Sequence, residues 1–198
     1  MEVLILGEGM RSREEYDPDD VRRLHGAARE AAELLGANLR LEALPDQRFD
    51  TVPLLEVIRA VEGHVADVEP DVVYTHHPGD LNADHGVTTR AVLTALRPMP
   101  DRKPVAVLAF ETLSSSEWNY SPALPRFRPQ WYVDITSTIE LKTAALEAYA
   151  TEIRDWPHPR SSEGVRVAAR RFGMEVGVGY AEAFEVMRIG PGPLPGIA

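Results

Sequence analysis

The stretch VVYTHHPGDLNADH, residues 72–85, decides the fold. Its first four residues form a short apolar run, which is typical of a strand buried on both faces. Asn82 is then suited to cap a helix that continues to Leu96, where Arg97-Pro98 ends it. A strand followed by a polar loop and a helix is the repeating unit of α/β folds, so the stretch predicts one such unit.

The same alternation of strands and helices extends along the whole chain. We therefore predict an α/β layered fold with a mainly parallel sheet, in a single domain over residues 1–190 with a flexible Pro/Gly tail at 191–198. The other expected strands are 3–6, 39–44 and 105–110, with a last apolar segment at 180–188, and the other expected helices are 18–35, 53–68, 138–153 and 162–171.

Composition limits the classes of function. The 198 residues carry a net charge of −10, which argues against nucleic acid and suits a small substrate. Cysteine is absent, so any metal must be held by His, Asp or Glu. No apolar run is long enough to span a bilayer, and no secretory signal follows Met1, so we expect a cytoplasmic protein.

The carboxyl ends of the predicted strands are the expected place for a site. Residues 76–85 follow such a strand and hold three His and two Asp. Asp84 and His85 are adjacent in a helix and point about 100° apart, so we expect His85 to bind a metal and Asp84 to orient it. The alternative is a helix cap with solvated acids and surface histidines.

At these residues the chain resembles a known family, the LmbE-like de-N-acetylases, which are zinc hydrolases related to N-acetylglucosaminyl-phosphatidylinositol deacetylase (PIG-L). The string Asp80-Leu81-Asn82-Ala83-Asp84-His85 is the most specific match. The resemblance implies a Rossmann-like sheet with helices on both faces, and zinc-dependent hydrolysis of an N-acetyl group from an N-acetylglucosamine-type sugar or conjugate. Further matches are residues 45–50, 71–79, 110–118, 157–161 and 177–184.

One family motif has no counterpart. The family begins with a strand followed by His-Pro-Asp-Asp, which supplies zinc ligands and the general base, so we expect the first strand and helix of the family to be missing before Met1. By resemblance only His85 carries over as a zinc ligand, and Asn82 and Asp84 as catalytic residues. Because catalytic zinc normally takes three protein ligands, we expect zinc to bind weakly or not at all and the chain as given to be inactive.

Several polar residues could contact a sugar. Carboxylate and guanidinium groups make paired hydrogen bonds with hydroxyls, although an exposed Asp–Arg pair can equally fix a turn. Trp118 could stack on a sugar face or be buried in its loop. The predicted substrate-binding residues are Arg13, Asp46, Arg48, His77, Glu111, His158 and Arg160.

Three functions remain open from the sequence. The first is a zinc N-deacetylase that acts on an amino sugar and that can form a homo-oligomer. The second is a catalytically inactive sugar-binding or regulatory relative. The third is a metal phosphoesterase that uses His76, His77, Asp80 and His85 together.

Overall fold

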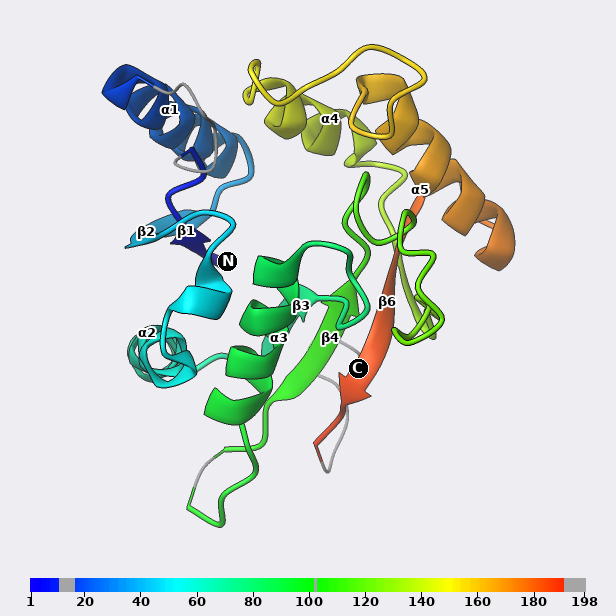
Figure 1. Cartoon of the computed structure of the whole chain (residues 1–198). Coiled ribbons are helices and arrows are strands. Elements are labelled where there is room, and N and C mark those ends of the chain that lie inside the picture. Colours follow the sequence, from blue (N-terminus) through cyan, green and yellow to red (C-terminus); the bar gives the residue numbers. More distant parts are fainter. Residues whose placement is uncertain (11–16, 102, 191–198) are drawn as a thin grey trace. The chain divides into compact units, whose positions relative to one another are not determined.

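The computed structural model describes residues 1–10, 17–101 and 103–190, drawn in colour in Figure 1. The described chain forms two compact units. Unit 1 holds residues 1–47 and 132–182, and unit 2 holds residues 48–131 and the chain from Ala183 onward. The predicted α/β class is confirmed, while the single domain over 1–190 stays a prediction. The predicted tail at 191–198 lies outside the described residues.

Unit 1 contains a parallel strand pair joined by a helix. Val3 pairs with Leu39 in this register, and a capping box at Asp17 begins the connecting helix. The elements of unit 1 are β1 (Glu2–Gly7), α1 (Pro18–Leu34), β2 (Asn38–Leu44), α4 (Ile139–Glu147) and α5 (Ser162–Val176). Within this unit α1 packs against α4.

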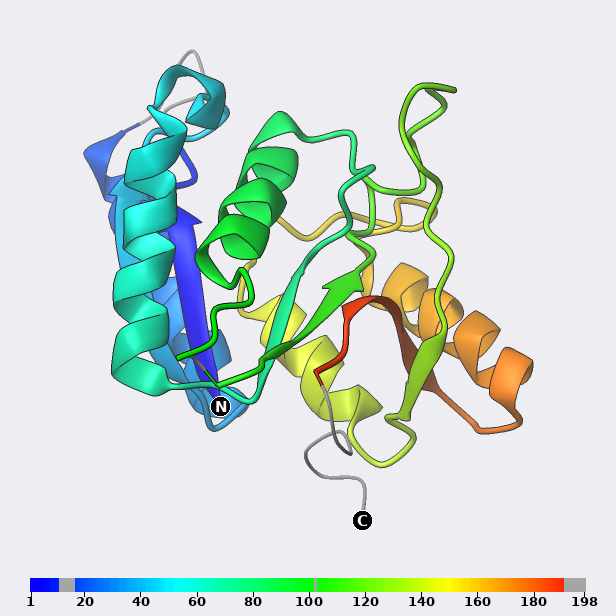
Figure 2. The same ribbon diagram turned by 90° about the horizontal axis from the view of Figure 1, so that it is seen from below.

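Unit 2 is built around parallel strands β3 and β4. Strand β6 pairs with β4 in the antiparallel sense, and the strand order is β3-β4-β6-β5. Helix α3 packs against β3 and α2, as Figures 1 and 2 show. The other elements of unit 2 are η1 (Phe49–Thr51), α2 (Leu54–Val68), β3 (Val72–His76), α3 (Ala83–Ala95) and β4 (Ala106–Phe110). The unit boundary crosses the last two strands: residues 132–134 of β5 (Trp131–Asp134) and 181–182 of β6 (Ala181–Arg188) belong to unit 1.

The strands differ in burial although their sequences are similarly apolar. Residues 106–109 of β4 are all buried, as predicted for a central strand. In β3 the side chain of Tyr74 is 50% exposed, and in β1 only Leu6 is buried. The reason is pairing: β4 has a strand on each side, whereas β3 pairs only with β4 and β1 only with β2 among the described residues. The predicted burial of β1 and β3 is therefore only partly confirmed.

Two helix ends differ from the prediction. Helix α4 ends at Glu147 rather than at residue 153, because the backbone after it forms tight turns. In one of these turns Glu152 N donates a hydrogen bond to Tyr149 O. No Gly or Pro marks this change in the sequence. Helix α5 continues past residue 171 to Val176, where Gly177 ends it with φ of 79°, a left-handed conformation that favours glycine. None of the described helices has the length and hydropathy required to cross a membrane.

Candidate functional site

The site segment lies in unit 2, at the carboxyl end of β3. It runs from the last residue of the strand to the first turn of α3, which Asn82 caps by accepting a hydrogen bond from Asp84 N at 2.9 Å. The backbone N–H of His77 donates to Phe110 O at 3.0 Å, so the ends of β3 and β4 stay joined here. The two polar segments that follow these strands are thus neighbours, as parallel pairing requires.

Asp80 is the centre of this arrangement. Its carboxylate accepts hydrogen bonds from Ser116 Oγ at 2.5 Å, from the Ser115 hydroxyl and from Asn82 N at 2.8 Å. His85 Nδ1 lies 3.0 Å from Asp80 Oδ1. Burial alone would raise the pKa of Asp80, but these four contacts outweigh it and hold the pKa well below its usual range. Asp80 is therefore a fixed carboxylate at neutral pH.

The imidazole of His85 is held between Asp80 and His76. The rings of His76 and His85 are stacked, with centroids 4.0 Å apart and planes inclined by 14°. Burial, and then repulsion from His85, lower the pKa of His76 to about 3 against the opposing effect of Asp80. His76 is thus neutral at pH 7, and Nδ1 of His85 is directed at a carboxylate. This leaves Nε2 as the atom of His85 with which it can bind a ligand.

The loop after β4 takes a strained shape to reach Asp80. Ser114 has φ of 66°, which L residues other than Gly rarely adopt. The carboxylate of Glu117 accepts hydrogen bonds from the N–H groups of Ser114 at 2.5 Å and Ser115 at 3.1 Å. These bonds hold the turn in place and direct the hydroxyls of Ser115 and Ser116 at Asp80. Strain of this kind persists only where surrounding contacts fix the backbone.

His77 faces away from this cluster and is fully buried. Its Nδ1 lies 2.8 Å from Glu185 Oε2, and its Nε2 lies 3.1 Å from the Pro125 carbonyl oxygen. A carbonyl oxygen only accepts, so Nε2 carries a proton in this contact. His77 therefore joins the end of β3 to β6 and to the segment around Pro125.

The loop after β4 is fastened to the site segment at a second point. Asn119 is buried; its Nδ2 donates to Gly79 O at 2.6 Å and its Oδ1 accepts from Ser121 N at 2.9 Å. A Cβ added at Gly79 would lie 2.0 Å from Pro125 O, so the two backbones pass closer than any side chain allows. The neighbours Trp118 and Tyr120 remain 40% and 77% exposed.

Of the predicted catalytic residues, Asp84 has a buried partner. Its Oδ1 accepts from Phe49 N at 2.9 Å, which joins η1 to the first turn of α3. Asn82 uses Oδ1 for the cap, so its Nδ2 is the group that can donate to a substrate. Glu111 is half-buried and Arg48 exposed, both within unit 2. The roles predicted for these residues stay predictions.

The other predicted substrate residues belong to unit 1 or are not described. Asp46 is half-buried in the turn after β2. His158 Nδ1 accepts from Arg160 N at 3.1 Å, and Arg160 Nη1 lies 3.3 Å from Glu152 Oε2. Both therefore make contacts within their own loop. Arg13 lies outside the described residues.

The described residues do not form a complete metal site. Within residues 1–10, 17–101 and 103–190, no group of three His, Asp or Glu side chains is placed to hold a metal ion. His76, His77, Asp80 and His85 do not converge on one point, because His77 is directed at Glu185. This geometry removes the support for a phosphoesterase that uses these four residues together.

Three contributors to the site were not predicted: the links from Ser115 and Ser116 to Asp80, the Asn119 amide and the Glu185 carboxylate. Asp80 was weighed only as one of four phosphoesterase ligands. Glu185 lies 108 residues from its partner His77, and no local pattern connects the two. The sequence of β6 carries two glutamates, Glu182 and Glu185, and nothing in it singles out Glu185 as the partner of His77.

A model of a known protein family matches the N-terminal part of the chain. The model of the PIG-L family, described as GlcNAc-PI de-N-acetylase, matches residues 1–96. The resemblance to the PIG-L/LmbE-like family is therefore confirmed.

Solved structures share the fold. The GalB 4-carboxy-2-hydroxymuconate hydratase from Pseudomonas putida is 23% identical, with a TM-score of 0.73 over 98% of this chain and 87% of that one. The N,N'-diacetylchitobiose deacetylase from Pyrococcus horikoshii is 18% identical, with a TM-score of 0.73 over 96% and 75%. The teicoplanin deacetylase Orf2, solved in a zinc inhibited form, is 17% identical, with a TM-score of 0.69 over 92% and 85%.

These likenesses establish the Rossmann-like fold and not the reaction. A hydratase and two deacetylases share it, so the fold alone does not decide between them. The activity has to be argued from the side chains at the end of β3.

Proposed function

We propose that the protein, when its zinc site is complete, is a de-N-acetylase of N-acetylglucosamine-type sugars or sugar conjugates. In this reaction water adds to the acetamide carbonyl, the C–N bond breaks, and acetate and the free amine leave. The observation that carries the proposal is the imidazole of His85 held by the Asp80 carboxylate, 3.0 Å away, in the segment whose sequence matches the PIG-L family. A carboxylate behind an imidazole is the usual support of a metal-binding histidine.

The residues near His85 have separable roles in this proposal. The Asn82 amide Nδ2 donates to the carbonyl oxygen as negative charge develops on it, and because an amide transfers no proton, its effect is on charge alone. Asp84 is held by the Phe49 N–H and fixes the first turn of α3. The N-terminal end of α3 favours the same negative charge.

Zinc is the metal that the family resemblance implies, and its fit to this chain is incomplete. His85 offers one nitrogen, whereas a catalytic zinc takes three protein ligands. A zinc site at His85 would need ligands from outside the described residues. We therefore expect the 198-residue chain to hold zinc weakly and to release no acetate above background.

The second candidate function is a sugar-binding relative without catalysis. The incomplete set of metal ligands favours this candidate, because no group of three metal-binding side chains occurs among the described residues. In this case the sugar binds at the end of β3 and stays intact. The cytoplasmic location stays a prediction for both candidates.

Two versions of the protein separate the candidates. The first is the chain as it stands, and the second carries the family's His-Pro-Asp-Asp segment and its strand before Met1. Zinc content is measured by elemental analysis after purification in a mild chelator, and acetate release from N-acetylglucosamine conjugates is measured with and without added zinc. The deacetylase proposal expects zinc-dependent release from the extended version only, lost in His85→Ala and kept in His64→Ala on α2.

The other outcomes decide against it. An extended version that binds sugar but releases no acetate supports the non-catalytic relative. About one tightly held zinc per unmodified chain, lost in His85→Ala, overturns the statement that the ligand set is incomplete. Failure of both versions to bind any acetylated sugar overturns both candidate functions.

A further inference from the structure

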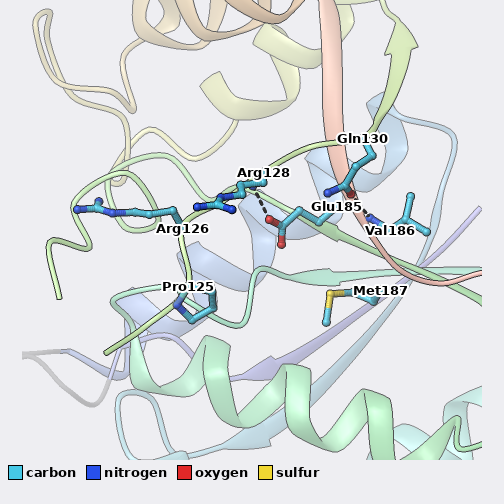
Figure 3. A pocket seen from close by; sticks show the side chains of 7 residues that line it. All are labelled: Pro125, Arg126, Arg128, Gln130, Glu185, Val186 and Met187. Carbon is cyan, nitrogen blue, oxygen red and sulfur yellow. Dashed lines mark hydrogen bonds between the residues drawn. The ribbon is translucent and has the colours of Figure 1, made fainter. Parts of the chain in front are cut away.

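Besides the candidate site, the described part of unit 2 has a smaller and a larger hollow. The smaller hollow, of about 440 Å³, lies between the segment before β5 and strand β6 (Figure 3). Its carboxylate, from Glu185, is already held by His77 at 2.8 Å and by the N–H of Arg128. The larger hollow, of about 850 Å³, is the more enclosed of the two.

The larger hollow lies where the chain enters β3 and β4. Its lining comes from the second half of α2, the end of α3, the segment before β4 and the end of β6. Its volume is within the range of small-molecule sites, roughly 300–1,000 Å³. The candidate site follows the opposite ends of the same strands, and the five residues of β3 span about 16 Å. A ligand in this hollow therefore does not overlap a substrate at His85.

The lining is largely apolar and concave. Ala95, Leu96 and Val105 are buried at its floor, whereas Met99 and Ile189 are exposed at its rim. A buried apolar floor beneath an exposed rim encloses a small molecule, in contrast to a flat patch that meets another protein. The other apolar residues of the lining are Val65, Ala66, Pro70, Pro98 and Pro104.

Most charges around the hollow already have a partner or are in water. Arg97 Nη1 lies 3.7 Å from Glu62 Oε1, and Lys103 pairs with Asp71 just outside the lining. These pairs leave neither cation free to attract a ligand. The other acids of the lining are exposed, where water solvates them: Glu69 and Asp101.

Arg188 is the exception among these charges. It is half-buried at the end of β6, and its Nε and Nη2 donate to the Val105 carbonyl oxygen at 3.3 and 3.2 Å. The acceptor is neutral, and no carboxylate contacts Arg188 in the part of the chain that the structure describes. Because withdrawing a charge from water without a counter-charge is costly, this guanidinium favours an anion beside it. Its Nη1 is directed at no described acceptor and can donate to one.

We propose that this hollow binds a small molecule with a carboxylate head and an aliphatic chain, of the chemical class of fatty acids. The carboxylate pairs with Arg188, and the chain covers Leu96, Val105 and Ile189. A cationic head in the same place would repel Arg188. The site is separate from the one at His85, and the proposal does not depend on the proposed function.

The test is calorimetry on the unmodified chain with two ligands below their micelle concentrations. Dodecanoate and dodecyltrimethylammonium have chains of equal length and opposite charge. We expect dodecanoate to bind about ten times more tightly, which corresponds to about 1.4 kcal/mol. Arg188→Met should remove this preference, and Ala66→Trp, at an exposed position of the lining, should weaken the binding of both ligands by filling the hollow.

Three further variants serve as controls. Arg59→Met and Arg59→Trp, on exposed α2 surface outside the lining, should change neither affinity. His85→Ala should also leave dodecanoate binding unchanged, because the candidate site lies at the other end of β3. Ala66→Trp keeps the test valid if Arg188→Met does not fold.

The remaining results all contradict the proposal. No binding of dodecanoate, equal affinity for the two ligands or tighter binding of the ammonium shows that Arg188 does not select an anion here. Binding that survives both Arg188→Met and Ala66→Trp, or that is lost in His85→Ala, places the fatty acid elsewhere. Binding that appears only in a version ending at Gly190 makes residues 191–198 the occupant of the hollow. None of these results concerns acetate release, so the proposed function is tested separately.

Discussion

The side chains at the end of β3 divide into two groups that face different ways. His76, Asp80 and His85 form one cluster, and His77 belongs to another although it is next to His76 in the chain. Successive residues of an extended segment point to opposite sides, so this division follows from the backbone itself. A run of histidines in a sequence is therefore weak evidence that they act together.

The neutral state of His76 makes stability depend on pH. The pKa of His76 is about 3 in the folded chain, below the usual value near 6.5, so between these values the unfolded chain binds the extra proton. In chelator-containing buffer we expect the free energy of unfolding to fall as pH drops from 6.5, by up to about 1.4 kcal/mol per pH unit from this residue. Urea unfolding at several pH values measures it. His76→Gln should flatten the dependence, whereas His64→Gln should not; equal slopes for all three proteins contradict the prediction.

Gly79 offers a sharp test of the close approach to Pro125. A Cβ there would lie 2.0 Å from Pro125 O and 2.7 Å from His77 Nε2, so Gly79→Ala must displace the loop. We expect a loss of about 1–3 kcal/mol in the free energy of unfolding, typical of forced overpacking. Gly86→Ala is the matched control, because its Cβ meets no atom within 4 Å and alanine favours α3. A neutral Gly79→Ala in chemical unfolding would show that the two segments separate easily.

At the scale of elements, contacts between residues close together in the chain, such as those within one strand–loop–helix segment, were predictable from the sequence. Contacts between residues far apart in the chain were not. The Asn82 cap and the position of α3 follow from local sequence, and both are confirmed. The bonds from Ser116 to Asp80 and from Glu185 to His77 span 36 and 108 residues. No periodicity carries such information. The early end of α4 had no signal either, since no Gly or Pro lies between Glu147 and Ile153.

Strand β6 carries two carboxylates whose contributions to stability should differ widely. Glu185 is 14% exposed and faces the fully buried His77, whereas Glu182 is 36% exposed beside a 41% exposed Lys142. Removing one partner of a buried pair costs about 3–5 kcal/mol, and a surface pair contributes at most about 1 kcal/mol. Glu185→Ala should therefore lower the unfolding free energy several times more than Glu182→Ala. Similar losses in urea unfolding would mean that His77 finds another partner.

At the scale of the whole molecule, strands β1 and β3 are among the end strands of the two sheets. Strand β1 pairs only with β2, and β3 only with β4, in the described part of the chain. Both are apolar strands whose free edges offer N–H and C=O groups to another chain. The exposed ring of Tyr74 adds apolar surface at β3.

We expect these edges to make the protein self-associate. Analytical ultracentrifugation over a wide concentration range should show dimers or larger species. Replacing the edge residue Val73 by Lys should shift the distribution toward monomer, because a charge on an edge strand opposes pairing. A matched Val167→Lys on the exposed surface of α5 tests whether any added charge has this effect. A monomer at every concentration contradicts the prediction.

The fastening of the loop after β4 to the segment after β3 has a consequence for motion. Ser116, Asn119 and Pro125 each bond to one of three residues in that segment: Asp80, Gly79 and His77. Neither segment can open to solvent while the other stays closed. Their amide protons should therefore exchange with deuterium at a common rate, as one cooperative unit of local unfolding. Loops are usually the parts that vary independently in evolution, but here a change in one would have to be accompanied by a change in the other.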